Sequence, residues 1–373
     1  MKPELRFLEF EENWSYKKLK DLLKVHTGRD YKHLEPGEIP VYGTGGYMLS
    51  VSDYLSNDDA IGIGRKGTIN KPYLLKAPFW TVDTLFYCTP REEVDLYFLL
   101  SLFKKINWEK YDESTGVPSL SKVNIEKLKV YSCELEEQRK IGDFFSKLDR
   151  QIELEEKKLE LLEQQKRGYM QKIFSQELRF KDKNGNEYPE WEVIKLKDIL
   201  SERKEYASKI GNYPHATLST SGISLKSDRY NRDFLVKDKN KKYKVTIMND
   251  ICYNPANLKF GVITRNHIGS VIFSPIYITF EVNNAHSPLF IELLVTRNDF
   301  INRVRKYEEG TVYERMAVKP EDFLNYETKI PCLEEQEKIG NFFSKLDELI
   351  NKQNQKIDGL KKRKRGFLQK MFV

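Results

Sequence analysis

Residues 135–174 read LEEQRKIGDFFSKLDRQIELEEKKLELLEQQKRGYMQKIF, and residues 333–372 read LEEQEKIGNFFSKLDELINKQNQKIDGLKKRKRGFLQKMF. The two stretches start 198 residues apart, and 22 of their 40 positions are identical. One element therefore occurs twice in the chain, and an internal repeat of this kind decides how the remaining residues are divided.

Both stretches carry apolar side chains at alternating steps of four and three residues, the heptad spacing of a coiled-coil helix. Neither contains proline, and about 38 helical residues at 1.5 Å each span roughly 57 Å. Two unrelated amphipathic helices, each packed on its own domain, would not share polar interruptions at the same places. We therefore expect the two helices to pair as a coiled coil. The expected interface residues are Ile141, Phe145, Leu148, Ile152, Glu155, Leu159, Leu162, Ile350, Ile357, Leu360, Lys364 and Phe367.

A second, shorter repeat accompanies the helices. The tetrapeptide ELRF occurs at Glu4–Phe7 and again at Glu177–Phe180, and a tryptophan follows each copy, at Trp14 and Trp191. The second copy comes directly after the first long helix, whereas the first copy begins the chain. The repeat thus behaves as a closed cycle that is cut open at one point. We expect the C-terminal helix to return close to the N-terminus, with a pseudo-twofold relation between the halves.

The two segments between the repeated elements do not resemble each other. Both alternate short β-branched and aromatic runs with glycine-rich turns and include a short helical stretch, which is typical of mixed α/β domains. The sequence predicts an α+β chain. Its expected parts are a first domain at 1–134, a first long helix at 135–178, a polar linker at 179–190, a second domain at 191–332 and a second long helix at 333–373.

Composition limits the classes of function. The chain has 373 residues and a formal net charge of +7, a basic excess that permits nucleic-acid binding without establishing it. The mean hydropathy of −0.62 and the lack of an apolar leader predict a cytoplasmic protein that does not enter a membrane. Four cysteines and five histidines show no metal-ligand spacing, so no structural metal is expected.

This order of elements resembles the specificity subunit of type I restriction–modification enzymes. Each dissimilar segment is followed by LEEQxKIGxFFSKLD and by a charged helix that ends in KRGxxQKxF. In the first segment, IGRKGTINKP followed by PFWTVDTLF is similar to a common form of the family's target-recognition domain. The resemblance covers essentially the whole chain, and its specificity lies in the order and duplication of the motifs.

The resemblance implies a division of labour between this chain and its partners. Each domain would read one half of a split, asymmetric sequence in double-stranded DNA, while the two helices pair antiparallel, separate the domains and dock two methyltransferase subunits. S-adenosylmethionine would bind those subunits, which methylate adenine, and DNA cleavage would require ATP-dependent restriction subunits. The chain itself would hold no cofactor and catalyse no reaction.

An antiparallel pair of these helices can adopt registers that differ by whole heptads. One register places Glu155 opposite Lys364 and Lys166 opposite Gln353, so that each polar interruption faces another. A slip of one heptad would set Glu155 against Ile357, and an ionised group that is buried against an apolar partner is costly. The sequence therefore predicts the register in which the polar interruptions match.

Glycine-rich loops supply the candidates for DNA contact. Arginine is the commonest reader of guanine, so Arg65 could contact base edges, although its loop could equally be a solvated turn. The lysine-rich run at 237–244 predicts phosphate contact rather than base contact, unless it is only a solvated face. The loops at 116–119 and 310–313 are equivalent in the two halves and could both face DNA. The candidates are Arg65, Lys66, Lys71, Trp80, Lys242, Lys244, Tyr253, Asn257, Lys259, Arg265, Asn266 and Tyr313.

Three strings bear a weak likeness to catalytic motifs. The glycine turn at 41–46 lacks the helix that should follow a cofactor-binding turn, and the NPAN string at 254–257 lacks an aromatic residue to stack a flipped adenine. The ExK string at 327–329 is too close to the acidic residues before it to form a usual nuclease site. A coiled-coil scaffold that gathers partners without specific DNA binding remains the alternative function.

The absence of a recognisable catalytic motif predicts that the purified chain neither methylates nor cuts DNA. Incubation with duplex DNA and radiolabelled S-adenosylmethionine should transfer no label, and added Mg²⁺ and ATP should produce no cleavage. Label transfer by the chain alone, free of any partner subunit, would contradict this interpretation.

Overall fold

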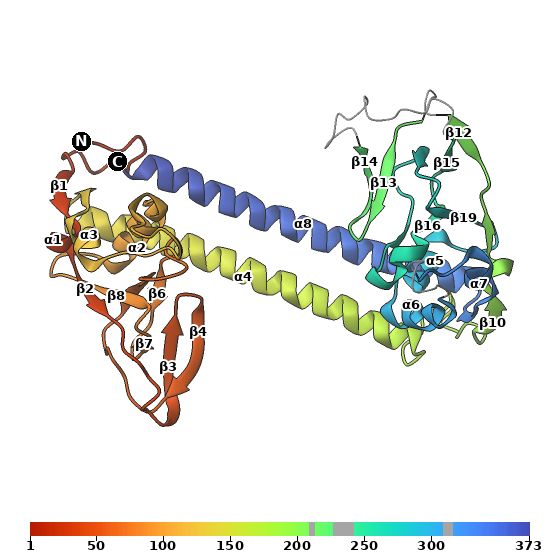
Figure 1. Cartoon of the computed structure of the whole chain (residues 1–373), viewed down its shortest axis with the longest axis horizontal. Coiled ribbons are helices and arrows are strands. Elements are labelled where there is room, and N and C mark those ends of the chain that lie inside the picture. Colours follow the sequence, from red (N-terminus) through yellow and green to blue (C-terminus); the bar gives the residue numbers. More distant parts are fainter. Residues whose placement is uncertain (209–212, 227–241, 309–315) are drawn as a thin grey trace. The chain divides into compact units, whose positions relative to one another are not determined.

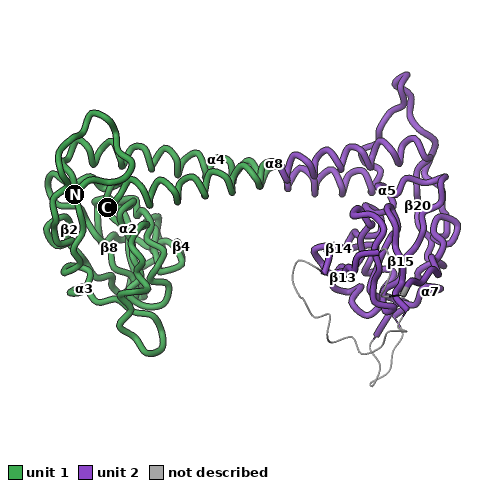
Figure 2. Tube along the Cα trace, turned by 90° about the horizontal axis from the view of Figure 1, so that it is seen from above, with its two compact units in different colours: residues 1–161, 352–373 green, residues 162–351 purple. Residues whose placement is uncertain are grey.

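The computed structural model describes residues 1–208, 213–226, 242–308 and 316–373 (Figure 1). The chain divides into two compact units, shown in two colours in Figure 2. Unit 1 comprises Met1–Leu161 and Lys352–Val373, and unit 2 comprises Leu162–Asn351. The long helices α4 (Leu135–Phe174) and α8 (Leu333–Met371) contribute residues to both units. Among the described residues, no helix combines the length and the hydropathy needed to cross a membrane.

Unit 1 contains a four-stranded antiparallel sheet in the order β2-β8-β5-β6 and a three-stranded sheet in the order β4-β3-β7. Strands β1 and β9 form a separate antiparallel pair. The elements of its globular part are β1 (Ser15–Lys18), α1 (Leu19–Leu22), β2 (Leu23–Thr27), β3 (Pro36–Gly43), β4 (Gly46–Val51), β5 (Ala60–Gly64), β6 (Tyr73–Leu75), β7 (Trp80–Thr81), β8 (Leu85–Pro90), α2 (Leu96–Lys105), α3 (Lys122–Lys127) and β9 (Lys129–Ser132).

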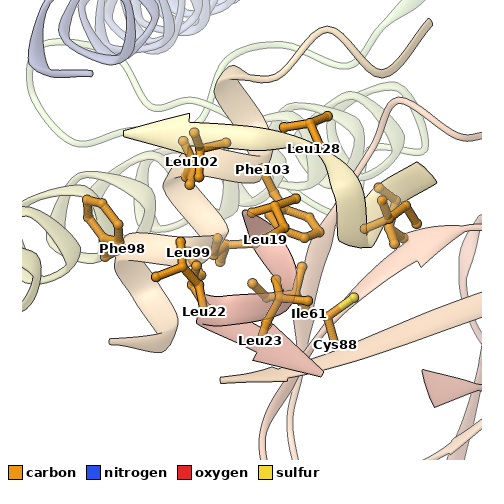
Figure 3. Close-up of a cluster of buried hydrophobic side chains, with 14 of the residues drawn as sticks. Leu19, Leu22, Leu23, Ile61, Cys88, Phe98, Leu99, Leu102, Phe103 and Leu128 are labelled. Atoms are coloured by element: carbon orange, nitrogen blue, oxygen red, sulfur yellow. The ribbon is translucent and has the colours of Figure 1, made fainter. Parts of the chain in front are cut away.

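Helix α2 and the four-stranded sheet bury the main core of unit 1 (Figure 3). Strand β5 is buried along its whole length, and α2 buries Phe98, Leu99 and Phe103. The start of α4 and the end of α8 add their apolar residues to the same core. Burial raises the pKa of the Cys88 thiol, so this side chain behaves as a small apolar group.

Unit 2 is also α+β. Its sheets have the orders β11-β19-β16-β17 and β12-β15-β18, and β13-β14 and β10-β20 are two-stranded pairs. The elements of its globular part are β10 (Glu192–Lys195), β11 (Leu200–Glu202), β12 (Tyr206–Ser208), β13 (Ala216–Ser219), β14 (Gly222–Leu225), β15 (Lys242–Thr246), β16 (Ile251–Tyr253), β17 (Ile263–Arg265), β18 (Val271–Phe273), β19 (Ile278–Val282), α5 (Pro288–Val295), α6 (Asn298–Val304), α7 (Pro320–Asn325) and β20 (Glu327–Ile330).

The LEEQ motif at the start of each long helix anchors that helix to its globular segment. The Gln138 amide accepts the N–H of Asp95, the residue that caps α2, at 3.0 Å and donates to the Cys133 carbonyl at 2.8 Å. Gln336 makes the same two bonds, to the Ser287 N–H before α5 and to the Pro331 carbonyl. One amide thus ties two segments of the chain together in each unit.

The glycine that follows this motif allows the helices to approach closely. A Cβ atom at Gly142 would lie 2.2 Å from an oxygen of Asp95, at the start of α2. A Cβ atom at Gly340 would lie 2.8 Å from the Cβ of Leu289 in α5. Each long helix crosses the first turn of a shorter helix so closely that a side chain would not fit. This explains why the KIG triplet, with its glycine, occurs in both long helices.

The ELRF tetrapeptides supply a buried counterion to the same motif. Arg6 forms two hydrogen bonds of 2.7 Å with the carboxylate of Glu137, and Arg179 binds Glu335 at 2.6 and 3.2 Å. Both glutamate side chains are 0% exposed, and the Trp14 indole also donates to Glu137. Two-pronged arginine–carboxylate contacts satisfy a buried carboxylate that would otherwise be costly.

The predicted closure of the cycle is confirmed. In unit 2 the N–H of Leu178 donates to the carbonyl of Lys172 at the end of α4. In unit 1 the N–H of Leu5 donates to the carbonyl of Lys370, the repeat counterpart of Lys172, at 2.8 Å. The N-terminal segment therefore completes the last turn of the C-terminal helix, and Trp14 packs edge-on against Phe372.

The helices pair antiparallel within each unit, but the predicted register is wrong by about one heptad. Glu155 accepts a hydrogen bond from Gln353 at 2.8 Å and pairs with Lys356, whereas Lys364 pairs with Asp149. The long polar side chains leave the seam and bind charged or amide groups beside it, so the register that seemed costly buries no unpaired charge.

The remaining seam residues follow this register. Leu148, Ile152, Leu360 and Phe367 form one apolar cluster in unit 1. Ile141 and Phe145 lie deeper, in the main core of that unit, and Ile357 is also buried. Leu159, Leu162 and Ile350 are half-buried.

We expect Glu137→Gln to destabilise the protein by about 3–5 kcal/mol, because it leaves the guanidinium of Arg6 without its counterion. Glu136→Gln is the matched control, since Glu136 is the exposed neighbour on the same turn, and surface changes usually stay within about 0.5 kcal/mol. Thermal unfolding followed by circular dichroism measures both. Equal stability of the two variants would show that the buried pair does not hold this end of the helix.

Candidate nucleic-acid interface

Two loops that the sequence presents as separate candidates lie together in unit 1. The N–H of Gly67 donates to the carbonyl of Pro118 at 2.8 Å, and the N–H of Leu120 donates to the carbonyl of Arg65 at 2.9 Å. The turn that follows β5 and the loop at 116–119 are therefore joined by backbone hydrogen bonds. We name this surface the paired loops of unit 1, residues 65–67 and 112–120.

Asp112 organises the second of these loops. Its carboxylate accepts the N–H of Ser119 at 2.8 Å, and the N–H and hydroxyl of Ser114, each at 2.9 Å. These bonds, that from Ser119 foremost, lower the pKa of Asp112. The ionised carboxylate of Asp112 therefore stabilises this loop at every pH above the usual pKa of aspartate. The stabilisation is lost as the pH falls through the lowered pKa of Asp112.

The paired loops carry basic side chains at the surface. Lys66 is exposed, and so is Lys71, which follows the first of these loops in the chain. Arg65 is half-buried, with its guanidinium 5.9 Å from the ring centre of Phe86 and one N–H near the carbonyl of Asp83. The exposed lysines can reach a phosphate, and Arg65 is held at the rim by its aromatic neighbour.

Trp80 does not belong to this surface. Its ring is buried in the core beside β3, and its indole N–H donates to the carbonyl of Arg29 at 2.9 Å. Neither the face of the ring nor its donor is available in this arrangement, so the structure does not favour a contact between Trp80 and DNA, which stays a prediction.

In unit 2 the candidates separate by burial. Lys242 and Lys259 are exposed, and Asn257 is half-buried in the turn that follows β16. The ammonium of Lys259 lies 5.0 Å from the ring centre of Phe260, which is itself 63% exposed. Lys242 and Lys259 are thus the exposed basic residues among the candidates that the structure describes in this unit.

Three candidates of unit 2 are buried in structural roles, which does not favour contact with DNA, and their DNA contacts stay predictions. Lys244 is 1% exposed and pairs with Glu202 at 2.6 Å. Tyr253 donates its hydroxyl to the carbonyl of Val318 and stacks against both Phe280 and Phe323.

Asn266 is the third of these candidates. Its amide group donates to Thr246 and Gly269 and accepts the N–H of Ile268, which uses its hydrogen-bonding capacity inside the protein.

Two further candidates have different outcomes. Arg265 is partly buried, and its guanidinium binds Glu292 and Asn249, each at 2.9 Å. Its free surface is small, so a contact to DNA would require these bonds to be exchanged. Tyr313 lies outside the described residues, as do the lysines at 237, 239 and 241.

Sequence reasoning missed an exposed aromatic surface on the hairpin of β3 and β4. Tyr47, Met48 and Tyr54 expose about half or more of their surface, and Gly46 has a φ of 109° in the connecting turn. Clustered apolar groups on a polar surface usually mark a contact site. The signal was present in the string GYMLSVSDY, where large apolar residues occur at positions that a solvated hairpin would fill with polar ones.

Among the described residues, no group of three histidine, cysteine or acidic side chains could hold a metal ion. What the described surfaces offer is hydrogen-bond donors, positive charge and exposed aromatic faces. Such surfaces bind nucleic acid through phosphate contacts and base-edge contacts.

Comparison with known proteins agrees with this class of fold and site. Residues 11–164 match the family model described as Type I restriction modification DNA specificity domain. The type I restriction enzyme MjaVIII specificity subunit of Methanocaldococcus jannaschii is 24% identical over 337 residues, covering 83% of this chain and 75% of that protein.

Solved structures show the same fold. The crystal structure of the type I restriction–modification S subunit from M. genitalium superposes with a TM-score of 0.69 at 16% identity, covering 100% of this chain and 99% of that one. A chain from a structure of complex assembly and conformational transition in the type I R-M system gives a TM-score of 0.51 at 13% identity, covering 97% and 98%.

The fold is thus that of a protein with two α+β units and two long helices, the class to which these solved structures belong. Residues 11–164 match the type I restriction modification DNA specificity domain, and the resemblance to type I specificity subunits that the repeated helices predict is confirmed.

We expect different effects from substituting the exposed Lys66 and the buried Lys244. Lys66→Met should weaken binding to duplex DNA at all sequences and reduce the slope of log affinity against log salt by about one, because one phosphate contact is lost. Lys244→Met should lower stability, since Glu202 loses its buried partner, and leave that slope unchanged. Fluorescence anisotropy across a salt series measures both. A wild-type slope for Lys66→Met would place this lysine away from the DNA.

Proposed function

We propose that this chain is the non-catalytic subunit that reads a bipartite, asymmetric DNA sequence and directs methyltransferase subunits to it. One observation supports this most: two unlike globular segments are joined to the paired helices by the same buried contacts. Those contacts are Arg6 with Glu137 in unit 1 and Arg179 with Glu335 in unit 2. Two domains that attach to the long helices by the same contacts but carry different surfaces are suited to binding two different DNA sequences.

In unit 1 the paired loops are the proposed reading surface. The backbone hydrogen bonds between them fix the position of Arg65 and Lys66 relative to each other and to residues 116–119. In this proposal Lys66 and Lys71 bind phosphate, which sets orientation, and Arg65 approaches a base edge. The exposed hairpin residue Tyr47 supplies apolar contact area beside them.

In unit 2 the proposed surface consists of Lys242, Asn257, Lys259 and the exposed ring of Phe260. Lys242 begins β15, and Lys259 and Phe260 end the short helical turn 255–260. The lysines neutralise phosphates, while the amide of Asn257 can donate and accept at a base edge. Because this set differs from that of unit 1, the two half-sites should differ in sequence.

The long helices are the proposed docking surface for partner subunits. Leu154 and Leu161 lie seven residues apart on α4, outside the seam, and are 50% and 58% exposed. Apolar side chains in such a row suit a partner helix. In this proposal two methyltransferase subunits supply S-adenosylmethionine and the methylation chemistry, and ATP-dependent restriction subunits join where cleavage occurs.

The same row of leucines also favours the alternative function, a scaffold that gathers partners and binds no specific DNA. A salt titration separates the two. A DNA reader with several phosphate contacts loses affinity steeply as salt rises and retains a preference for one sequence. A scaffold would show weak binding that does not depend on sequence, and that result would overturn the proposal.

If each domain reads its own half of the target independently, the exchange of one domain should have a defined outcome. Replacing residues 14–134 with the corresponding segment of another specificity subunit should change one half of the methylated target and leave the other half as it was. Sequencing of methylated adenines in cells that carry the hybrid and its methyltransferase measures this. A change in both halves would contradict independent readers.

A further inference from the structure

The centre of the helix pair has a feature that the flanking contacts lack. Glu155 and Gln353 are counterparts in the repeat, 198 residues apart, and they meet each other: the Gln353 amide donates to the Glu155 carboxylate and carbonyl, each at 2.8 Å. A residue meets its own counterpart only at the midpoint of an antiparallel pair of related helices. We call Glu155 and Gln353 the central pair.

Two contacts on either side of the midpoint are repeated in both halves. In unit 1, Lys364 pairs with Asp149, and Phe367 packs edge-on against Phe144. In unit 2 the counterparts repeat these contacts, since Lys166 pairs with Asp347 and Tyr169 packs against Phe342. These flanking pairs fix the register, because a shift by one heptad would break all of them.

The flanking pairs cannot, however, determine which helix pairs with which. If α4 paired with the α4 of a second copy of this chain, Lys166 would still find an Asp149, and Tyr169 would still find a Phe144. Two α8 helices would likewise join Lys364 to Asp347. Identical helices could therefore use the same register and the same flanking contacts.

Charge distinguishes these arrangements at the central pair, and also at the exposed Lys361–Glu156 pair, which two α4 helices would replace with Glu163 against Glu156. Two α4 helices would bring Glu155 against Glu155, and like charges at one site repel. Two α8 helices would bring Gln353 against Gln353, which loses the hydrogen bonds that the charged carboxylate accepts from Gln353 and from Lys356. Gln353 is 6% exposed, so the midpoint is shielded enough for this difference to count.

We propose that Glu155 and Gln353 act as a discriminating pair, which makes α4 pair with α8 of the same chain rather than exchange helices with a second copy. Elsewhere the seam differs only by Leu159 for Ile357, Tyr169 for Phe367 and Ile173 for Met371, and none of these replacements changes a charge. A single polar position that determines partner choice is an established property of coiled coils.

The repeat offers a reciprocal variant that tests this proposal. Lys158 is the counterpart of Lys356, so in E155Q/Q353E the carboxylate moves to α8 and finds a lysine in the equivalent place. E155Q alone makes both central residues glutamine and removes the difference in charge at the midpoint. E153Q is the matched control, because Glu153 lies on the same helix and binds only Arg150 and Lys157 within it.

Two full-length copies with different affinity tags are co-expressed, and the fraction of one copy that co-purifies with the other is measured. We expect little exchange for the wild type, E153Q and E155Q/Q353E. Exchange should rise about tenfold for E155Q, a factor that corresponds to about 1.4 kcal/mol. Wild-type exchange in E155Q, or equally raised exchange in E155Q and the reciprocal variant, would overturn the proposal.

A stability measurement keeps the proposal testable if E155Q folds poorly. Q353E places two carboxylates at the midpoint, so its melting temperature should fall below that of the wild type, and the reciprocal variant should recover most of the loss. A reciprocal variant that melts no higher than Q353E would show that the two residues do not act as a pair, and would overturn the proposal.

Discussion

A buried pair of opposite charges fixes each globular segment to the helical frame. The carboxylates of Glu137 and Glu335 are removed from water, and each is satisfied by the guanidinium of an ELRF arginine, Arg6 or Arg179. A buried carboxylate without its partner is strongly destabilising, so the two motifs depend on each other. This dependence explains in physical terms why a tetrapeptide and a helix start that are far apart in the chain recur together.

The sequence was sufficient to predict the long helices, the closure of the cycle and the α+β segments, because each leaves a local or repeated signal. Heptad spacing is such a signal, yet it is unchanged by a shift of seven residues. The register therefore depended on where Glu155 and Lys364 find their partners. Their flexible stems carry the charges out of the seam to Lys356 and Asp149, and heptad positions alone do not show this.

The exposure of the candidate DNA-contact residues could be predicted only in part, for a related reason. Residue type and loop context identified Lys66, Lys259 and Lys242, which are exposed. The same reasoning selected Lys244 because it belongs to a lysine-rich run, whereas Glu202, 42 residues away in the chain, buries it. Burial of this kind is set by contacts between distant strands, so a single stretch of sequence cannot reveal it.

The hydrogen bond from Leu5 to the carbonyl of Lys370 also has a consequence for synthesis on the ribosome. Unit 1 consists of the first 161 residues and the last 22. Its fold therefore cannot be completed until the last turns of α8 have been synthesised. At about 5–20 residues per second, the 190 residues of unit 2 take roughly 10–40 s to be made. During that interval the apolar surface that will receive Leu368 and Phe372 stays uncovered. The unit that begins first is thus completed last.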